Sequence, residues 1–312
     1  MAAFSHTPVL LEQCIQALAL KEGATYVDCT LGGGGHSREI LERTQSARLI
    51  GVDKDEEALT AAGDVLKGFG ERVKLVKSDF SDITAILSEA GVQSVDGVLM
   101  DLGVSSWQLD SFQRGFSYRA EDAPLDMRMD RSQALNAHDV VNSYPQERIA
   151  KLLREYGEEK FAGRIASNIV RARQAAPLET CGELVKLIYD SIPAPARRTG
   201  GHPAKRTFQA IRIEVNGELE MLERAVSGWV QALSPGGRIA VITFHSLEDR
   251  IVKHTLRRLE SPCICDPRSP LCTCGKKPQI KILTKKPIEA DEQELKSNSR
   301  SQSAKLRAAE RI

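Results

Sequence analysis

The chain has 312 residues, enough for one large domain or for a domain that carries a sizeable insertion. Hydrophobic residues make up 41% and charged residues 27%, which excludes a disordered or fibrous protein over most of the length. The formal net charge of +1 argues against non-specific coating of nucleic acid, although residues 245–312 are basic. The sequence has neither an apolar run long enough for a membrane span nor a secretion signal, so we expect a cytoplasmic protein.

Four short apolar runs in the first hundred residues predict strands, and stretches with helical periodicity separate them. The runs are TYVDCT, ARLIGVD, VKLVKSD and VDGVLMD, and each leads into Asp or another polar residue. Strands that alternate with helices at this spacing predict βαβ units and a parallel sheet. In such α/β sheets, ligands bind at the carboxyl ends of the strands.

The strand pattern stops at Trp107 and stays absent for about a hundred residues, longer than an ordinary connection. We therefore predict a helical insertion over 107–206, a substrate-recognition subdomain between two parts of one core, 1–106 and 207–312. Residues 207–233 keep apolar positions on one face and predict a single long helix back to the sheet. A buried strand in GRIAVITFHS, a helix in LEDRIVKHTLRRL and an edge hairpin from KILTKKPI and SAKLRAAERI complete the prediction.

A run of four glycines follows the first predicted strand, in YVDCTLGGGGHS. Glycines at a strand-to-helix turn let the backbone approach a nucleotide-like ligand closely. Asp53 ends the second predicted strand about twenty residues later, where a carboxylate accepts hydrogen bonds from ribose hydroxyls. A nicotinamide dinucleotide is the alternative cofactor, but its G-x-G-x-x-G pattern would place the third glycine at Ser37 or Arg38. A methyl donor without a pyrophosphate does not need that glycine.

Asp101 ends the fourth predicted strand, in DGVLMDLGVSSWQLD, where a reacting group belongs in such a sheet. Asp110 continues the same loop, and capping of the following turn is the commoner role for Asp there.

Four long blocks carry a resemblance to a known family: HTPVLLEQC, GFSYRAEDAPLDMRMD, HPAKRTFQAIRIEVNGELE and ITFHSLEDRIVK. Together with the glycine loop, they make nearly the whole chain similar to the bacterial ribosomal small-subunit RNA cytidine N4-methyltransferases. The resemblance implies a Rossmann-like α/β fold, that of class I S-adenosylmethionine-dependent methyltransferases, with a helical insertion subdomain. It also implies methylation of a cytidine in the decoding region of 16S rRNA within the small ribosomal subunit, with no DNA or membrane partner.

The family's cofactor contacts carry over by motif to seven positions. They are Gly34, Gly35, His36, Asp53, Phe80, Asp101 and Gln108. Without the resemblance, Phe80 fits a core aromatic equally well, and His36 fits a solvent-facing residue in the first turn of a helix.

Asp101 is also our candidate catalytic residue. Cytosine N4 is a poor nucleophile because its lone pair is delocalised into the ring, so it must be aligned with the donor methyl. A carboxylate that orients the amine and takes its proton suffices. DNA amine methyltransferases instead place two prolines and an aromatic after the acid, whereas LGVSS follows Asp101 here. His245 is a second candidate near the substrate, and a purely structural histidine is the alternative.

Two basic segments, RRTGGHPAKR and RIVKHTLRR, offer contacts to RNA phosphates, chiefly through Lys205 and Arg206. A solvated helix face is the alternative for such charges. A non-catalytic RNA-binding module would keep the basic segments but would not need the glycine loop with Asp53.

Four of the seven cysteines, Cys263, Cys265, Cys272 and Cys274, form two C-x-C pairs in the basic tail. Four thiolates suit a closed, structural zinc site, although C-x-C is tighter than the usual C-x-x-C spacing. A structural zinc ion is therefore a hypothesis for this segment.

Overall fold

The computed structural model describes residues 8–198, 201–266, 271 and 273–312. The chain divides into two compact units, the first made of Met1–Gly103 with Leu219–Ile312 and the second of Val104–Glu218. The predicted insertion, 107–206, lies inside the second unit. None of the helices in the described ranges has the length and apolar character needed to cross a membrane.

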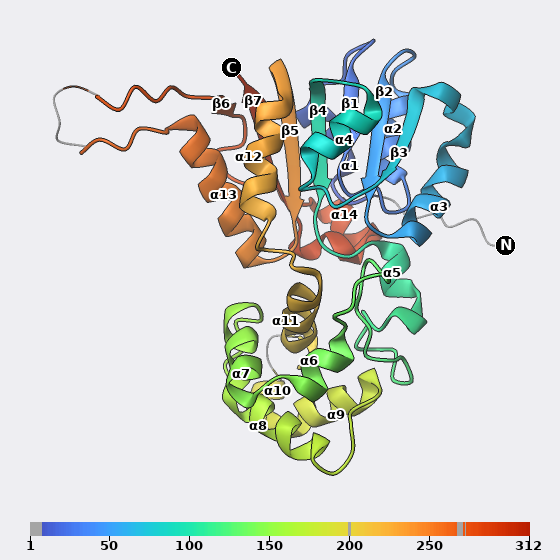
Figure 1. Ribbon diagram of the computed structural model, residues 1–312, viewed down its shortest axis with the longest axis vertical. Helices are drawn as coiled ribbons and strands as arrows, with labels where there is room; N and C mark the ends of the chain where they lie inside the picture. The colour runs from blue at the N-terminus through green and yellow to red at the C-terminus, as the bar shows by residue number, and fades with distance from the viewer. Residues whose placement is uncertain (1–7, 199–200, 267–270, 272) are drawn as a thin grey trace. The chain divides into compact units, whose positions relative to one another are not determined.

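The first unit contains a seven-stranded sheet in the order β3-β2-β1-β4-β5-β7-β6 (Figure 1). Strands β1 to β5 run parallel to one another, whereas β7 is antiparallel to both β5 and β6. The strands are β1 (Thr25–Asp28), β2 (Arg48–Asp53), β3 (Val73–Lys77), β4 (Val95–Asp101), β5 (Leu233–Thr243), β6 (Ile280–Ile282) and β7 (Lys305–Arg311). The four predicted strands and their parallel arrangement are confirmed.

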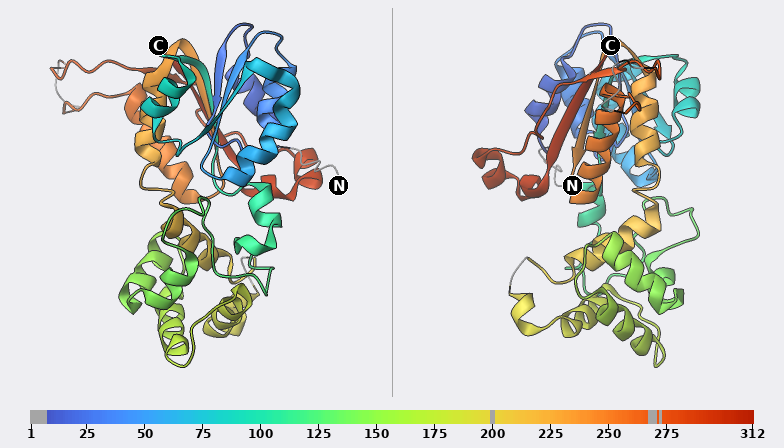
Figure 2. Two further views of the ribbon diagram at one scale, coloured as in Figure 1. Left: turned by 45° about the vertical axis from the view of Figure 1, so that its right-hand side comes forward. Right: turned by 90° about the vertical axis from the view of Figure 1, so that its left-hand side faces the viewer.

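Helices cover both faces of this sheet (Figure 2). Along β5, Ile239 and Val241 pack into the core beneath α4, α12 and α13, whereas Ala240 and Ile242 pack beneath α1, α2 and α3. Burial on both faces explains why the strands read as continuous apolar runs. The helices of this unit are α1 (Leu11–Leu18), α2 (Gly35–Glu42), α3 (Glu56–Leu66), α4 (Ile83–Ala90), α12 (Leu222–Ala232), α13 (Ser246–Glu260) and α14 (Glu292–Ser297).

The second unit is helical, as predicted, and has its own apolar core, which includes Leu153, Ile165, Leu184 and Ile211. Its helices are α5 (Ser106–Asp110), α6 (Ala137–Ser143), α7 (Gln146–Glu155), α8 (Ala162–Arg173), α9 (Cys181–Ser191), α10 (Ala194–Arg197) and α11 (Lys205–Asn216).

The prediction of one helix over 207–233 is wrong, because the segment forms two helices, α11 and α12, that belong to different units. Gly217 follows α11 with φ +62°, and its N–H donates to the Ile213 carbonyl. This left-handed residue ends the helix, as glycine commonly does. The apolar spacing happens to continue through the break, so periodicity alone did not reveal it.

The predicted C-terminal hairpin is present as the antiparallel pair of β6 and β7. The strand at the edge is β6, while β7 lies between β5 and β6 inside the sheet. The last segment of the sequence therefore forms part of the core of the first unit, where Leu306 and Ala308 are fully buried.

Candidate functional site

The glycine loop joins β1 to α2 at the carboxyl edge of the sheet. Asp28, the last residue of β1, is buried and accepts hydrogen bonds from Ser37 Oγ (2.7 Å) and Thr30 N (3.2 Å). Gly34 caps α2 with φ +76°, a conformation that favours glycine. A Cβ on Gly35 would lie 2.6 Å from Pro8 Cγ, so a side chain there would clash. Both positions therefore require glycine.

Asp53, the last residue of β2, is held against this loop. Its Oδ2 accepts a hydrogen bond from Gly32 N at 2.9 Å, and its Oδ1 accepts one from Asp55 N at 2.9 Å. Burial of the carboxyl raises the pKa of Asp53 to about 6. The glycine loop and Asp53, both predicted from the sequence to bind a nucleotide-like ligand, thus lie side by side in the folded chain.

Asp101, the last residue of β4, lies at the same edge of the sheet. Its backbone N–H donates to Thr30 Oγ1 at 2.6 Å, which ties β4 to the loop after β1. Its carboxyl Oδ1 is buried and has no hydrogen-bond partner among the described residues. Burial, together with the nearby charges of Asp28 and Glu248, raises the pKa of Asp101 to about 8. At neutral pH this carboxyl therefore holds a proton in most ligand-free molecules.

His36 is buried next to Asp101, so the alternative of a solvent-facing ring is wrong. The Nε2 atom of His36 lies 3.0 Å from the Val9 carbonyl oxygen. Because a carbonyl oxygen only accepts hydrogen bonds, Nε2 carries the hydrogen. The Nδ1 atom lies 3.9 Å from Asp101 Oδ2. Burial lowers the pKa of His36 to about 4. The ring is therefore neutral, with the unprotonated Nδ1 on the Asp101 side.

Phe80 and His245 occupy the ends of two further strands. Phe80 follows β3, is half-buried, and packs against the core beneath α4 and α12, while its carbonyl accepts a hydrogen bond from Trp229 Nε1 at 2.8 Å. His245 follows β5 and caps α13, because its Nδ1 accepts a hydrogen bond from Glu248 N at 3.4 Å. Its Nε2 lies 3.2 Å from Glu248 Oε1. The buried Nε2 atom makes no hydrogen bond among the described residues, so capping explains only one side of the ring, and the role of His245 near the substrate stays a prediction.

Three residues of this region, Asp28, Thr30 and Glu248, were not selected from the sequence. Asp28 and Glu248 influence the pKa of Asp101, and Thr30 bonds its backbone. The apolar run of β1 ends at Asp28, so the sequence indicates its position at a strand end but not its effect on Asp101. Glu248 three residues after the N-cap of α13 forms a capping box, a recognisable pattern that identifies the cap but not its electrostatic effect on Asp101.

The remaining predicted residues belong to the second unit. Gln108 is buried in a capping box, where its backbone N–H donates to Ser105 Oγ and its Oε1 accepts from Ser105 N. Lys205 and Arg206 are exposed in the first turn of α11, and Arg206 Nη1 lies 3.4 Å from the Glu158 carbonyl. Their roles toward cofactor and RNA stay predictions.

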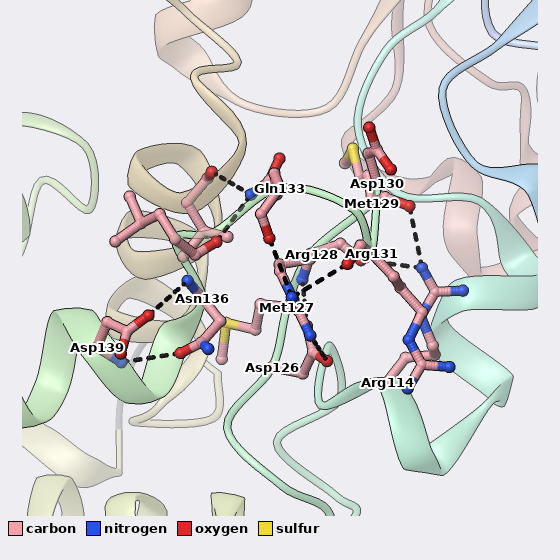
Figure 3. Close-up of polar contacts among 12 residues, drawn as sticks. Arg114, Asp126, Met127, Arg128, Met129, Asp130, Arg131, Gln133, Asn136 and Asp139 are labelled. Carbon is pink, nitrogen blue, oxygen red and sulfur yellow. Dashed lines mark hydrogen bonds and ion pairs between the residues drawn. The ribbon is translucent and has the colours of Figure 1, made fainter. Parts of the chain in front are cut away.

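The PLDMRMD block forms a constrained loop in the second unit (Figure 3). Met127 is fully buried with φ +58°, unusual for a residue with a side chain. Its N–H donates to the Arg114 carbonyl at 3.0 Å, and its own carbonyl accepts from Asn216 Nδ2 at 2.8 Å. Next to it, Arg128 pairs with Asp126 at 2.8 Å. Hydrogen bonds on both sides of Met127 thus hold a conformation that the residue itself disfavours.

Three tail cysteines converge in the first unit. The sulfur atoms of Cys263, Cys265 and Cys274 all lie within 4.8 Å of one another. Hydrogen bonds from Thr273 lower the pKa of Cys265. Cys272, the fourth member of the predicted set, lies outside the described residues.

Comparison with known proteins places these features in a family. A sequence model described as the MraW methylase family matches residues 3–312. A relative from Symbiobacterium thermophilum, named ribosomal RNA small subunit methyltransferase H, is 56% identical over 99% of this chain and 98% of its own. A relative of the same name from Clostridium botulinum is 56% identical over 99% of both chains. The crystal structure of an rRNA methylase from Streptococcus thermophilus aligns with a TM-score of 0.44 and 10% identity, covering 100% of this chain and 99% of that one.

The predicted fold class, a Rossmann-like α/β methyltransferase core with a helical insertion, is confirmed by the sheet topology and the family match. Coverage of almost every residue by one family model, with relatives above half identity over their full lengths, establishes the relationship. The chain belongs to the MraW methylase family.

Proposed function

We propose that this chain transfers a methyl group from S-adenosylmethionine to N4 of a cytidine in the decoding region of small-subunit ribosomal RNA, in the cytoplasm. Family membership supports methyl transfer, and the names of the relatives support the RNA substrate. The observation that carries the proposal is Asp101 Oδ1, a buried acceptor without a partner among the described residues, beside the glycine loop. Buried polar atoms are almost always paired, so this one indicates a ligand.

The residues around Asp101 fit S-adenosylmethionine. The loop at Gly34 and Gly35 presents backbone without side chains, and Asp53 supplies a carboxylate for the ribose hydroxyls. Phe80 offers an aromatic side chain, and Gln108 is a further ligand by family resemblance. When bound, the cofactor supplies a methyl group made electrophilic by its positive sulfur.

In this proposal Asp101 contacts the cofactor, as the family resemblance implies, and has two tasks toward the substrate: to hold the incoming amine and to accept its proton. Positioning matters most, because the delocalised lone pair of the amine reacts only when it is aligned with the methyl group. Once methylated, the nitrogen is cationic and loses its proton readily, so a carboxylate with a pKa of about 8 is an adequate acceptor. The neutral His36 next to Asp101 adds no positive charge that would repel the donor.

Lys205 and Arg206 are the proposed contacts to RNA phosphates. Both side chains are exposed, and charge-assisted contacts of this kind hold an RNA in place without reading its sequence. Selection of one cytidine then depends on the pocket that receives the base, as in other enzymes that act on a nucleobase.

The test is transfer of labelled methyl groups to undermethylated small ribosomal subunits and, in parallel, to naked 16S rRNA, followed by mapping of the modified base. We expect a single N4-methylcytidine. Asp101→Asn should abolish most of the transfer, whereas Asp96→Asn, at the opposite end of β4, should preserve it if the fold is intact. Methylation at carbon 5 or at a ribose hydroxyl, or no transfer to either RNA substrate, would refute the proposal.

A further inference from the structure

The connection between α13 and β6 runs from residue 261 to residue 279 and contains no helix or strand in its described part. Connections of this length without secondary structure are uncommon inside a domain. Its apolar side chains do not form a core, since Ile264 is 73% exposed and Leu271 is 77% exposed. Burial of hydrophobic surface therefore does not hold this segment in place.

Three thiols converge where hydrophobic contacts are missing. Cys263 and Cys265 come from the outgoing half of the connection and Cys274 from the returning half, with all three sulfur atoms within 4.8 Å of one another. Cys263 Sγ and Cys274 Sγ are 3.8 Å apart. The Thr273 N–H points to Cys265 Sγ at 3.4 Å, the kind of backbone hydrogen bond that orients a metal-bound thiolate.

We propose that Cys263, Cys265 and Cys274 bind a structural zinc ion that ties the two halves of this connection together. Thiolates at about 2.3 Å from a tetrahedral zinc ion lie about 3.8 Å from one another, which matches the separation of Cys263 and Cys274. A disulfide would need its sulfur atoms at about 2.05 Å. Each thiol loses its proton on binding, so three thiolates give a site with a net charge of −1. Lys276 and Lys277, which follow Cys274 after Gly275, carry positive charges that offset it.

The proposal does not depend on methyl transfer, because the zinc ion crosslinks a surface segment and takes no part in the reaction. Its first test is elemental analysis of the full chain, purified under reducing conditions from zinc-supplied cells and dialysed. We expect one zinc ion per chain. The double variant Cys263→Ser/Cys265→Ser should lose it, whereas Cys181→Ser, which removes a buried thiol of the second unit, should retain it.

A second measurement identifies the ligands directly. The metal-free protein is titrated with Co²⁺, whose thiolate charge-transfer absorption should appear with the native chain and the Cys181→Ser variant but not with the double variant. Back-titration with Zn²⁺ should remove it. The proposal fails if the native chain neither contains zinc nor takes it up in competition with a chromophoric chelator. It also fails if the double variant retains the metal, or if freshly purified protein carries a disulfide between Cys263 and Cys274.

Discussion

Replacement of Asp101 by Asn should change the pH dependence of cofactor binding as well as its strength. The carboxylate is the proposed binding form, and in the ligand-free chain its pKa is raised to about 8 by burial and by neighbouring acids. A raised carboxyl pKa means that the charged form becomes available only as pH rises. The affinity of the native chain for S-adenosylmethionine should therefore increase with pH and level off above pH 8.

The size of the effect follows from that pKa. A carboxyl with a pKa of about 8 is roughly 90% ionised at pH 9 and about 3% ionised at pH 6.5. At pH 9 the Asn variant loses a charge-assisted hydrogen bond, about 1.5 to 3 kcal/mol, or about 10- to 150-fold in affinity. Between pH 9 and pH 6.5 the ratio of native to variant affinity should fall by about 7- to 25-fold, because the protonated carboxyl binds about as well as the Asn amide. Any protonation change of S-adenosylmethionine itself affects both chains equally, so it does not alter this ratio.

Isothermal titration calorimetry at pH 6.5, 7.5, 8 and 9 measures the ratio, and repetition in buffers of different ionisation enthalpy counts the protons released on binding. We expect nearly one proton released near pH 7 by the native chain and none from this position in the variant. Single-turnover transfer at saturating cofactor and RNA then separates binding from chemistry. A ratio that is constant across this pH range would refute the assignment of Asp101 as an ionising ligand.

Three further changes test other parts of the structure. Asp53→Ala should weaken cofactor binding by about 1.5 to 3 kcal/mol in calorimetry, because it removes the proposed ribose acceptor, whereas Glu56→Ala, an exposed acid nearby, should have no effect. Replacing Lys205 and Arg206 by Ala should weaken RNA binding without changing cofactor affinity. The slope of log RNA affinity against log salt concentration should become shallower by about 1 to 2. An equal loss of affinity at every salt concentration would indicate a folding defect. Gly217→Ala should lower the free energy of unfolding by about 1 kcal/mol, because its φ is +62° and no atom crowds a Cβ there; unchanged denaturation would contradict this.

Local patterns predicted the strands and the glycine loop, because each depends on residues close together in the chain. The pairing of Asp53 with Gly32 also followed from strand order, since parallel strands end at the same edge. The raised pKa of Asp101 could not be predicted, because it arises from Asp28 and Glu248, which are distant in sequence and come together only in the fold. The helix break at Gly217 was missed because apolar spacing continued on both sides of it.

The division of the first unit into two stretches of sequence constrains how the protein forms during synthesis. The first four strands leave the ribosome before the second unit does, yet β4 lacks its neighbour β5 until all of Val104–Glu218 has been made. During that interval the edge of β4 that later pairs with β5 has no strand beside it. Partly built sheets with unpaired edges are prone to aggregation. The second unit has its own apolar core and a continuous sequence, so it can fold while the sheet waits. Completion of the carboxyl edge of the sheet therefore comes late, after the helical unit has emerged.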